Sequence, residues 1–371
     1  MVGAVKEYKA NHPDPFLLKI IALAYGADAK NLNMPLNSGN NILFSLGKNV
    51  RALVNTDAPD SEYLKIIVKE GDYFFQHLNT LHKVEFLTDE SCIKSNLKDY
   101  FFASGTTLFI TPYGGWQRII SPLSENPKEP PKKTLGSEEM IEELHALKDI
   151  KNFDTILLAE LFSESEDRGI FNLQPYLRSI SKNFKAIVGV YVSPPAKPEW
   201  IEWAYAVGVD FIWYDLLCYH RDYSDKLPCR INYNRTIESL NHAVEVFPKG
   251  CVFTSLLAGL ESSKETVEGI NYFLSRGITP VIRTAPSYPV PLDELLILYR
   301  TLGDGIKSKG LDGPMMNRMD HLLTPNELLR HSLGGRTRIK NFVDSFTTLM
   351  KNSAVRNIYK LRRNLKVKEV K

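Results

Sequence analysis

The chain has 371 residues, enough for one large α/β domain with added segments or for two domains of ordinary size. Its net charge of +3 is too small to indicate a nucleic-acid partner, and no apolar run approaches the roughly eighteen residues of a membrane span. The first residues lack the apolar stretch of a signal peptide, so we expect a cytoplasmic protein that binds neither nucleic acid nor membrane. The four cysteines are widely spaced and form no CxxC pair, so they indicate neither a zinc site nor a disulfide framework.

Residues 1–100 are predicted to form a small α+β lead-in. The stretch PFLLKIIALAYGA (15–27) is typical of an amphipathic helix. The stretch NILFSLGKNVRALVN (41–55) predicts a hairpin that turns at residues 46–49.

From residue 106 onward, short apolar runs rich in Val, Ile, Phe and Thr alternate with segments of helical period. Such runs are typical of strands buried on both faces, as in parallel sheets. The predicted strands are 106–111, 153–161, 185–192, 209–217, 251–258 and 278–284. The predicted helices between them are 136–147, 173–183, 198–208, 234–247 and 263–277.

Several of these helices carry start and stop signals. Glu138 and Glu139 put acids in a first helical turn, and Ser263 followed by Glu265 is typical of an N-cap. Glycines 208, 250 and 277 stand where the helices should end.

Strand and helix therefore alternate about six times, which predicts an α/β fold with right-handed crossovers and a curled parallel sheet. We expect an open (β/α)6 TIM-type barrel over residues 101–290, with chemistry at the carboxyl ends of the strands. Residues 291–371 are predicted to be a helical extension, with helices at 292–310, 324–333 and 338–352, and a basic tail. His321 and His331 in this extension have no spacing that indicates a metal site, and no metal is expected.

The segment HAVEVFPKGCVFTSLLAGLESSKETVEGINYFLSRGITPVI (242–282) resembles the second half of a radical S-adenosylmethionine barrel, in particular its biotin-synthase-like branch. In that superfamily a strand with a Gly-Leu-Glu turn precedes a helix of the type ETxEGIxxFLxxxGI. Residues 207–217 resemble the preceding strand, and residues 157–177 stand where the superfamily has its second strand and an acidic loop. The resemblance covers roughly residues 106–286.

The resemblance implies a site that this chain lacks. Radical S-adenosylmethionine enzymes hold a [4Fe–4S] cluster on three cysteines, usually spaced CxxxCxxC, in the loop after the first strand. The corresponding loop, residues 111–126, contains no cysteine. The Gly-Gly-Glu that follows the second strand is also missing, with Glu160 as its only remnant. We therefore expect a degenerate relative without an iron–sulfur cluster, and S-adenosylmethionine or a related nucleoside is the ligand that the resemblance implies.

Two interpretations of the loop after the first strand stay open. Its backbone amides, tryptophan and arginine could hold an anionic or planar ligand. Alternatively, the tryptophan fills the space that a cluster would occupy, and we favour this interpretation. The candidate residues are Tyr113, Gly114, Gly115, Trp116 and Arg118.

Polar side chains at the later strand ends supply further candidates. Asp215 and His220 are the nearest approach to an acid–base pair, with a structural hydrogen bond as the alternative role, and Glu160 is expected near the barrel mouth. By resemblance, Ser255 and Glu261 lie along the nucleoside side of the cofactor. Arg283, followed by Tyr288, could bind a carboxylate or phosphate, or form a salt bridge to Glu160 or Asp215.

The leading functional hypothesis is a cluster-free, radical-SAM-like pseudoenzyme that acts as a binding, scaffold or partner subunit. Its partner would be an active radical SAM paralogue or a maturation complex in cofactor biosynthesis. The alternative is a non-radical enzyme that acts on S-adenosylmethionine or a small anionic substrate through Asp215, His220, Glu160 and Arg283. A third hypothesis is a cluster completed by cysteines from a partner chain. Radical cleavage by the chain alone is not expected, because the cluster cysteines are absent.

Overall fold

The structure is a computed structural model. It describes residues 15–28, 41–46, 50–55, 64–77, 80–87, 97, 99–114, 134–147, 153–160, 163, 165–184, 186–227, 231–285, 287–311, 319, 321–324, 327–328 and 361. The chain divides into two compact units, Met1–Glu90 and Ser91–Lys371.

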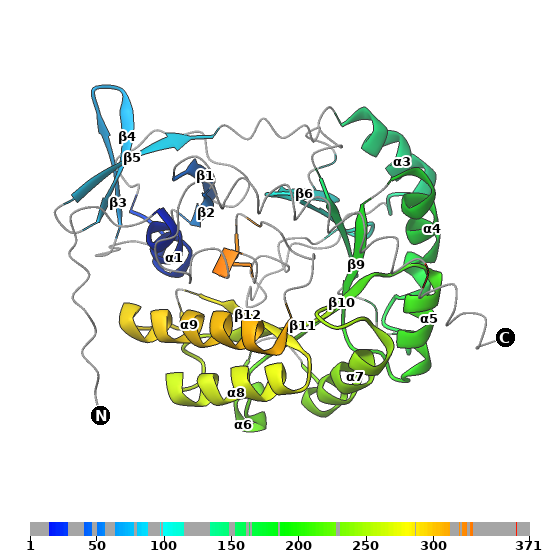
Figure 1. The fold of residues 1–371 in the computed structure, drawn as a ribbon. Helices are drawn as coiled ribbons and strands as arrows, with labels where there is room; N and C mark the ends of the chain where they lie inside the picture. The colour runs from blue at the N-terminus through cyan, green and yellow to red at the C-terminus, as the bar shows by residue number, and fades with distance from the viewer. Residues whose placement is uncertain are drawn as a thin grey trace. The chain divides into compact units, whose positions relative to one another are not determined.

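In the part of the first unit that the structure describes, helix α1 accompanies a five-stranded antiparallel sheet in the order β2-β1-β5-β4-β3 (Figure 1). Its elements are α1 (Pro15–Tyr25), β1 (Asn41–Ser45), β2 (Arg51–Asn55), β3 (Lys65–Lys69), β4 (Asp72–His77) and β5 (Thr80–Phe86). The predicted helix and the predicted hairpin are confirmed, since β1 and β2 pair antiparallel from Asn41↔Asn55 to Ser45↔Arg51. Strands β3 to β5 were not predicted.

The second unit is built on a curled seven-stranded sheet in the order β12-β11-β10-β9-β8-β7-β6. Strand β6 (Phe101–Ser104) pairs antiparallel with β7 (Thr107–Ile110), and from β7 onward each neighbouring pair is parallel. The other strands are β8 (Thr155–Glu160), β9 (Ile187–Val192), β10 (Phe211–Leu217), β11 (Val252–Leu257) and β12 (Thr279–Arg283). All six predicted strands are therefore confirmed, and every residue of β8, β9 and β11 is buried.

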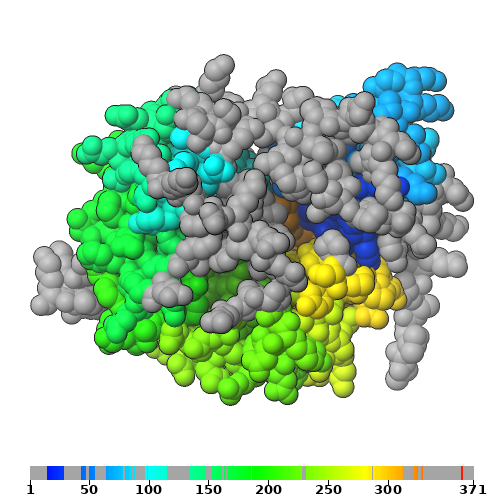
Figure 2. All heavy atoms as spheres, turned by 180° about the vertical axis from the view of Figure 1, so that it is seen from behind, coloured from blue at the N-terminus to red at the C-terminus, as the bar shows by residue number. Residues whose placement is uncertain are grey.

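Helices follow the parallel strands and line one side of the sheet, which makes this side convex and the other concave (Figure 1). Seen from behind, the spheres coloured green to yellow, the range that includes these helices, lie along the left and lower rim of the view (Figure 2). The helices are α3 (Ser137–Ala146), η3 (Phe171–Leu173), α4 (Gln174–Asn183), α5 (Glu199–Val207), α6 (Arg221–Ser224), α7 (Tyr233–Val246), α8 (Ser263–Ser275) and α9 (Leu292–Lys309).

The helix ends show how the local sequence sets these boundaries. The cap of α8 is Ser262, one residue before the predicted Ser263, because Ser262 and Glu265 form a complete capping box. Helix α5 ends at Gly208, whose φ of 124° lies in the region that favours glycine. The predicted helix at 338–352 lies outside the described residues.

A segment of the C-terminal extension lies on the concave face of the sheet. The Oγ of Ser104 lies 2.7 Å from the Nδ1 of His321, and the imidazole packs 5.4 Å from the ring of Phe109 and 5.5 Å from that of Phe102. Met319 and Leu323 are also buried. In Figure 1 this segment is the orange trace on the hollow side of the sheet.

Candidate functional site

A polar cluster lies on the concave face near the carboxyl ends of β9 to β12. Its centre is the half-buried carboxylate of Asp215. One carboxylate oxygen accepts a hydrogen bond from the phenol of Tyr191, and the other accepts one from the hydroxyl of Ser255. Both oxygens of Asp215 are thus engaged by neighbouring strands.

Ser255 joins this carboxylate to two further side chains. Its Oγ accepts hydrogen bonds from the Nε1 of Trp213 at 3.1 Å and from the Nε of Arg283 at 3.4 Å. A hydroxyl has one donor and two lone pairs, so these three bonds use its whole capacity. Arg283 also lies over the indole ring of Trp213, with 5.0 Å from Cζ to the ring centroid.

Strand register explains why these residues meet. Asp215 pairs with Ser255, and Trp213, two residues earlier on the same strand, pairs with Tyr191. Because side chains two residues apart share a face of a strand, Trp213 and Asp215 point to the same side. Trp213, Ser255 and Arg283 are almost completely buried. The cluster therefore joins one half-buried carboxylate to one buried guanidinium through a shared, buried hydroxyl.

Glu160 lies on the other face of the sheet. Tyr191 pairs with Ala159, so the next residue of β8, Glu160, points away from the Tyr191 side. Its Oε1 accepts a hydrogen bond from the amide of Ser163 at 3.0 Å, and its Cγ lies close to Gly169, where a Cβ would come within 2.3 Å. Glu160 therefore serves the loop that leads to α4 and is not grouped with Asp215.

The negative charge of Glu160 contributes to raised pKa values of two tyrosines. Burial first and then Glu160 raise the pKa of the Tyr113 phenol. Burial, Tyr113 and Glu160 raise the pKa of Tyr176 to about 12, and its phenol donates to the carbonyl of Leu135 at 2.6 Å. These tyrosines are therefore neutral hydrogen-bond donors near pH 7.

His220 belongs to a third arrangement, at the loop after β10. The backbone amides of Tyr219 and His220 donate to the two carboxylate oxygens of Glu261 at 2.8 and 2.6 Å. Burial raises the pKa of Glu261, and the two amide bonds oppose that rise. Glu261 thus ties the turn after β11 to the loop after β10, and the structure does not bring His220 into the Asp215 cluster.

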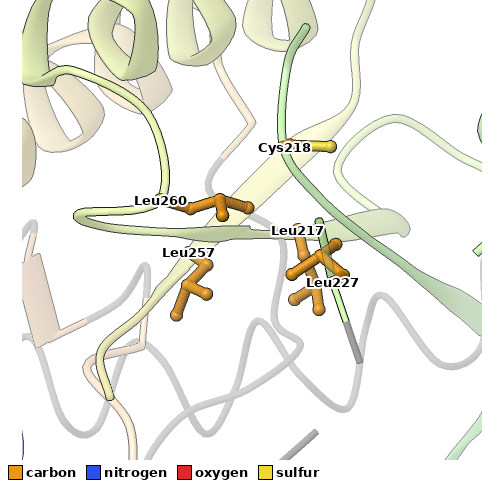
Figure 3. Packing of buried hydrophobic residues seen from close by; sticks show 5 residues of the cluster. All are labelled: Leu217, Cys218, Leu227, Leu257 and Leu260. Atoms are coloured by element: carbon orange, nitrogen blue, oxygen red, sulfur yellow. The ribbon is translucent and has the colours of Figure 1, made fainter. Parts of the chain in front are cut away.

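An apolar cluster fills the strand ends beside this loop (Figure 3). Its buried members are Leu217, Cys218, Leu227, Leu257 and Leu260, which come from the ends of β10 and β11 and from the loops that follow them. Tyr288 packs against the cluster, and Gly259 approaches the backbone of Tyr288 so closely that a Cβ would lie 2.5 Å from its carbonyl oxygen. Close packing therefore explains why position 259 is occupied by glycine, which has no Cβ.

The loop after β7 is described only in its first part. Gly114 is buried with a φ of 74°, and its amide donates to the carbonyl of Thr111 at 2.7 Å, which closes a tight turn. The remaining candidates of this loop, Gly115, Trp116 and Arg118, lie outside the described residues. Whether Trp116 fills the space that a cluster would occupy, or the loop binds a ligand, therefore stays a prediction.

Sequence reasoning missed Tyr191 and Trp213. Both lie inside strands that were predicted to be buried on both faces, where apolar and aromatic residues are expected as core. The one available signal was the spacing of Trp213 and Asp215, which places both on one face of β10.

Within the described part of the chain, no group of three or more His, Cys, Asp or Glu side chains could hold a metal ion. Among the helices that the structure describes, none has the length and apolarity to cross a membrane.

Comparison with known proteins assigns no family. No protein-family model matches the sequence, and no curated protein matches it significantly. Among solved structures, the chain is similar to coproporphyrinogen III oxidase (HemN) from Escherichia coli, described as a radical SAM enzyme, with a TM-score of 0.34 and 10% identity. It is also similar to methylornithine synthase (PylB), with a TM-score of 0.38 and 13% identity. The matches cover 42% and 60% of this chain, 41% of HemN and 74% of PylB, so the chain spans about two fifths of the first of these proteins.

Proposed function

We propose that the second unit is an open (β/α)6 barrel of the radical S-adenosylmethionine type that carries no cluster, and that the protein works as a binding, scaffold or partner subunit in cofactor biosynthesis or maturation. The observation that carries this proposal is the hydrogen-bonded cluster around Asp215. Its carboxylate and the hydroxyl of Ser255 are engaged by the chain's own side chains at the strand ends.

The two thiol groups that the structure describes are too far apart to hold one cluster. The described cysteines are Cys218 and Cys251, and the loop 111–126 contains none. Cys218 follows the last residue of β10, whereas Cys251 precedes β11, next to the first residues of β10. Along the strands, six residues lie between the position of Cys251 and that of Cys218, which corresponds to a distance of about 20 Å. The two sulfurs therefore stand at opposite ends of the sheet and cannot share one cluster.

The concave face supports the same proposal. The imidazole of His321 packs on Phe109 and Phe102, so the chain covers part of its own inner wall. An enzyme that encloses a substrate usually keeps a concave site open at the strand ends. A subunit that acts through its outer surface needs no such opening.

Anaerobic reconstitution with iron and sulfide tests the proposal. We expect the full chain and a variant with all four cysteines changed to serine to bind the same small amount of iron, without a cluster absorbance band. Binding of about four irons per wild-type chain, lost in the cysteine-free variant, would refute the proposal.

One observation favours the alternative function, non-radical chemistry on S-adenosylmethionine or a small anionic substrate. Asp215 is half-buried rather than fully buried, and Arg283 reaches it through Ser255. Calorimetric titration with S-adenosylmethionine and its cleavage products separates the two functions. Saturable heat that Asp215→Asn abolishes would support the alternative, and absence of heat with every nucleoside would count against it.

A further inference from the structure

Three aromatic side chains gather on the outer surface of the second unit. Phe171 comes from η3, and Trp200 and Trp203 come from α5, one strand–helix unit later. The ring centroids lie 5.7 Å apart for Phe171 and Trp203, 6.4 Å for Phe171 and Trp200, and 6.1 Å for the two tryptophans. Each ring therefore contacts the other two, and we call these three residues the aromatic patch.

The aromatic patch is not part of the core. Phe171 is 54% exposed and neither tryptophan is buried, whereas Leu173 beside Phe171 and Ile201 between the tryptophans are buried. The helices are thus anchored by other side chains, and the patch adds apolar surface that faces water. Two of the four tryptophans of the chain lie in it. Tryptophan is enriched among the interface residues that supply most of the binding energy, and these two tryptophans are partly exposed.

The patch is held in place before any partner arrives. The carboxylate of Asp167, itself buried, accepts a hydrogen bond from the backbone amide of Phe171 at 2.7 Å. This bond fixes the start of η3, and the tryptophans stand on a regular helix. A surface that is already ordered loses little conformational entropy on binding.

The charges beside the patch are mostly acidic, because the one lysine just before α5, Lys197, is paired with Glu166 at 3.1 Å. The charged side chains of α5 are Glu199 and Glu202, both acidic and both exposed. The Oε1 of Glu202 also lies 3.2 Å from the Nε2 of His242. Aromatic faces carry a negative quadrupole that attracts cations, and the planar guanidinium group of arginine stacks on them best.

We propose that Phe171, Trp200 and Trp203, with Glu199 and Glu202 beside them, form a docking surface for an arginine-rich segment of a partner protein. This inference rests on the proposed partner role and names the surface that would serve it. The arginine guanidinium groups stack on the rings while the two carboxylates supply the opposite charge.

Fluorine NMR of the full chain labelled with 5-fluorotryptophan tests the docking surface. The probe is a ten-residue peptide of alternating arginine and alanine, and a matched peptide of glutamate and alanine is the control. We expect the arginine peptide to move the Trp200 and Trp203 resonances in a saturable way while that of the buried Trp213 stays in place. Equal movement with the glutamate peptide, or no saturable movement at millimolar peptide, would overturn the proposal.

Two variants of matched exposure localise the effect. Phe171→Ala removes a side chain that is 54% exposed, and Ile297→Ala removes an apolar side chain on α9 that is 53% exposed. We expect Phe171→Ala to weaken peptide binding about three- to tenfold and Ile297→Ala to leave it unchanged. Equal weakening by both variants would overturn the proposal. Movement of the Trp200 and Trp203 signals with protein concentration alone, together with dimers in sedimentation, would instead make a second copy the occupant.

The peptide-binding test and the iron-reconstitution test can fail independently of each other. If the chain binds no cluster and the aromatic patch does not bind the arginine peptide, the docking-surface proposal is refuted and the proposal of a cluster-free barrel is retained. If a cysteine-dependent cluster forms, the proposed function fails whatever the peptide does.

Discussion

Ser255→Ala tests the polar cluster on the concave face most directly. Ser255 is completely buried, and its Oγ bonds to Trp213 and Asp215 on β10 and to Arg283 on β12, the two strands beside its own. The substitution removes one oxygen and adds no bulk, so the backbone need not move. Its whole effect comes from the hydrogen bonds that disappear.

The size of the effect follows from what each partner loses. The indole N–H of Trp213 would lose its acceptor in fully buried surroundings, which costs about 1–3 kcal/mol. The bond to the charged Asp215 contributes about 1.5–3 kcal/mol, whereas the bond from Arg283, at 3.4 Å, is long and adds little. We therefore expect the free energy of unfolding of the second unit to fall by about 3–5 kcal/mol.

Urea denaturation followed by tryptophan fluorescence and circular dichroism measures this loss. Each unit is fitted with its own transition, because the chain has two compact units. Ser275→Ala is the matched control, since Ser275 is exposed and its hydroxyl donates only to the carbonyl of Tyr272, at 2.7 Å. A loss for Ser255→Ala within about 0.5 kcal/mol of the control would refute the role assigned to the hydroxyl.

Two further predictions concern the turn after β11 and the helix that follows it. Gly269→Ala should destabilise the second unit by about 1–3 kcal/mol, since its Cβ would lie 2.7 Å from the Cβ of Tyr219, which cannot rotate away. Gly305→Ala should cost less because its Cβ meets the Cδ1 of Leu274, the end of a side chain that can rotate about its own bonds, and equal losses in urea denaturation would contradict this reasoning. Glu261 has a folded pKa above its ordinary value of 4.5, so the folded state binds its proton more tightly than the unfolded state does. Its contribution is therefore full below pH 4.5 and is lost as the pH rises through the folded pKa, so the stability advantage of wild type over Glu261→Gln should shrink over that range. An advantage that stays constant or grows with pH would contradict the assigned shift.

Strands β7 to β12 could be predicted from the sequence because each is a short, continuous apolar run bounded by turn residues, whereas β6 (Phe101–Ser104) was not predicted. Strands β3 to β5 escaped because their lysines, glutamates and histidines interrupt the apolar pattern, and a small antiparallel sheet tolerates such residues on an open face.

Only part of the candidate site could be predicted from the sequence. The ends of β10, β11 and β12 could be located, which is why Asp215, Ser255 and Arg283 were all singled out. The face of the sheet on which each side chain lies could not be predicted, since a shift of one residue along a strand moves a side chain to the other face. Glu160 shows this, because Ala159 rather than Glu160 shares the face of Tyr191.

The contact between Ser104 and His321 also bears on how the chain folds during synthesis. These residues are 217 positions apart, so the inner wall formed by Phe102 and Phe109 is made long before the segment that covers it. Until residues 319–324 leave the ribosome, this wall keeps apolar surface in water, where other chains can reach it. The closing step is a contact of high sequence separation, which folding reaches slowly. A nascent chain that ends before residue 319 should therefore bind chaperones more strongly than the complete one.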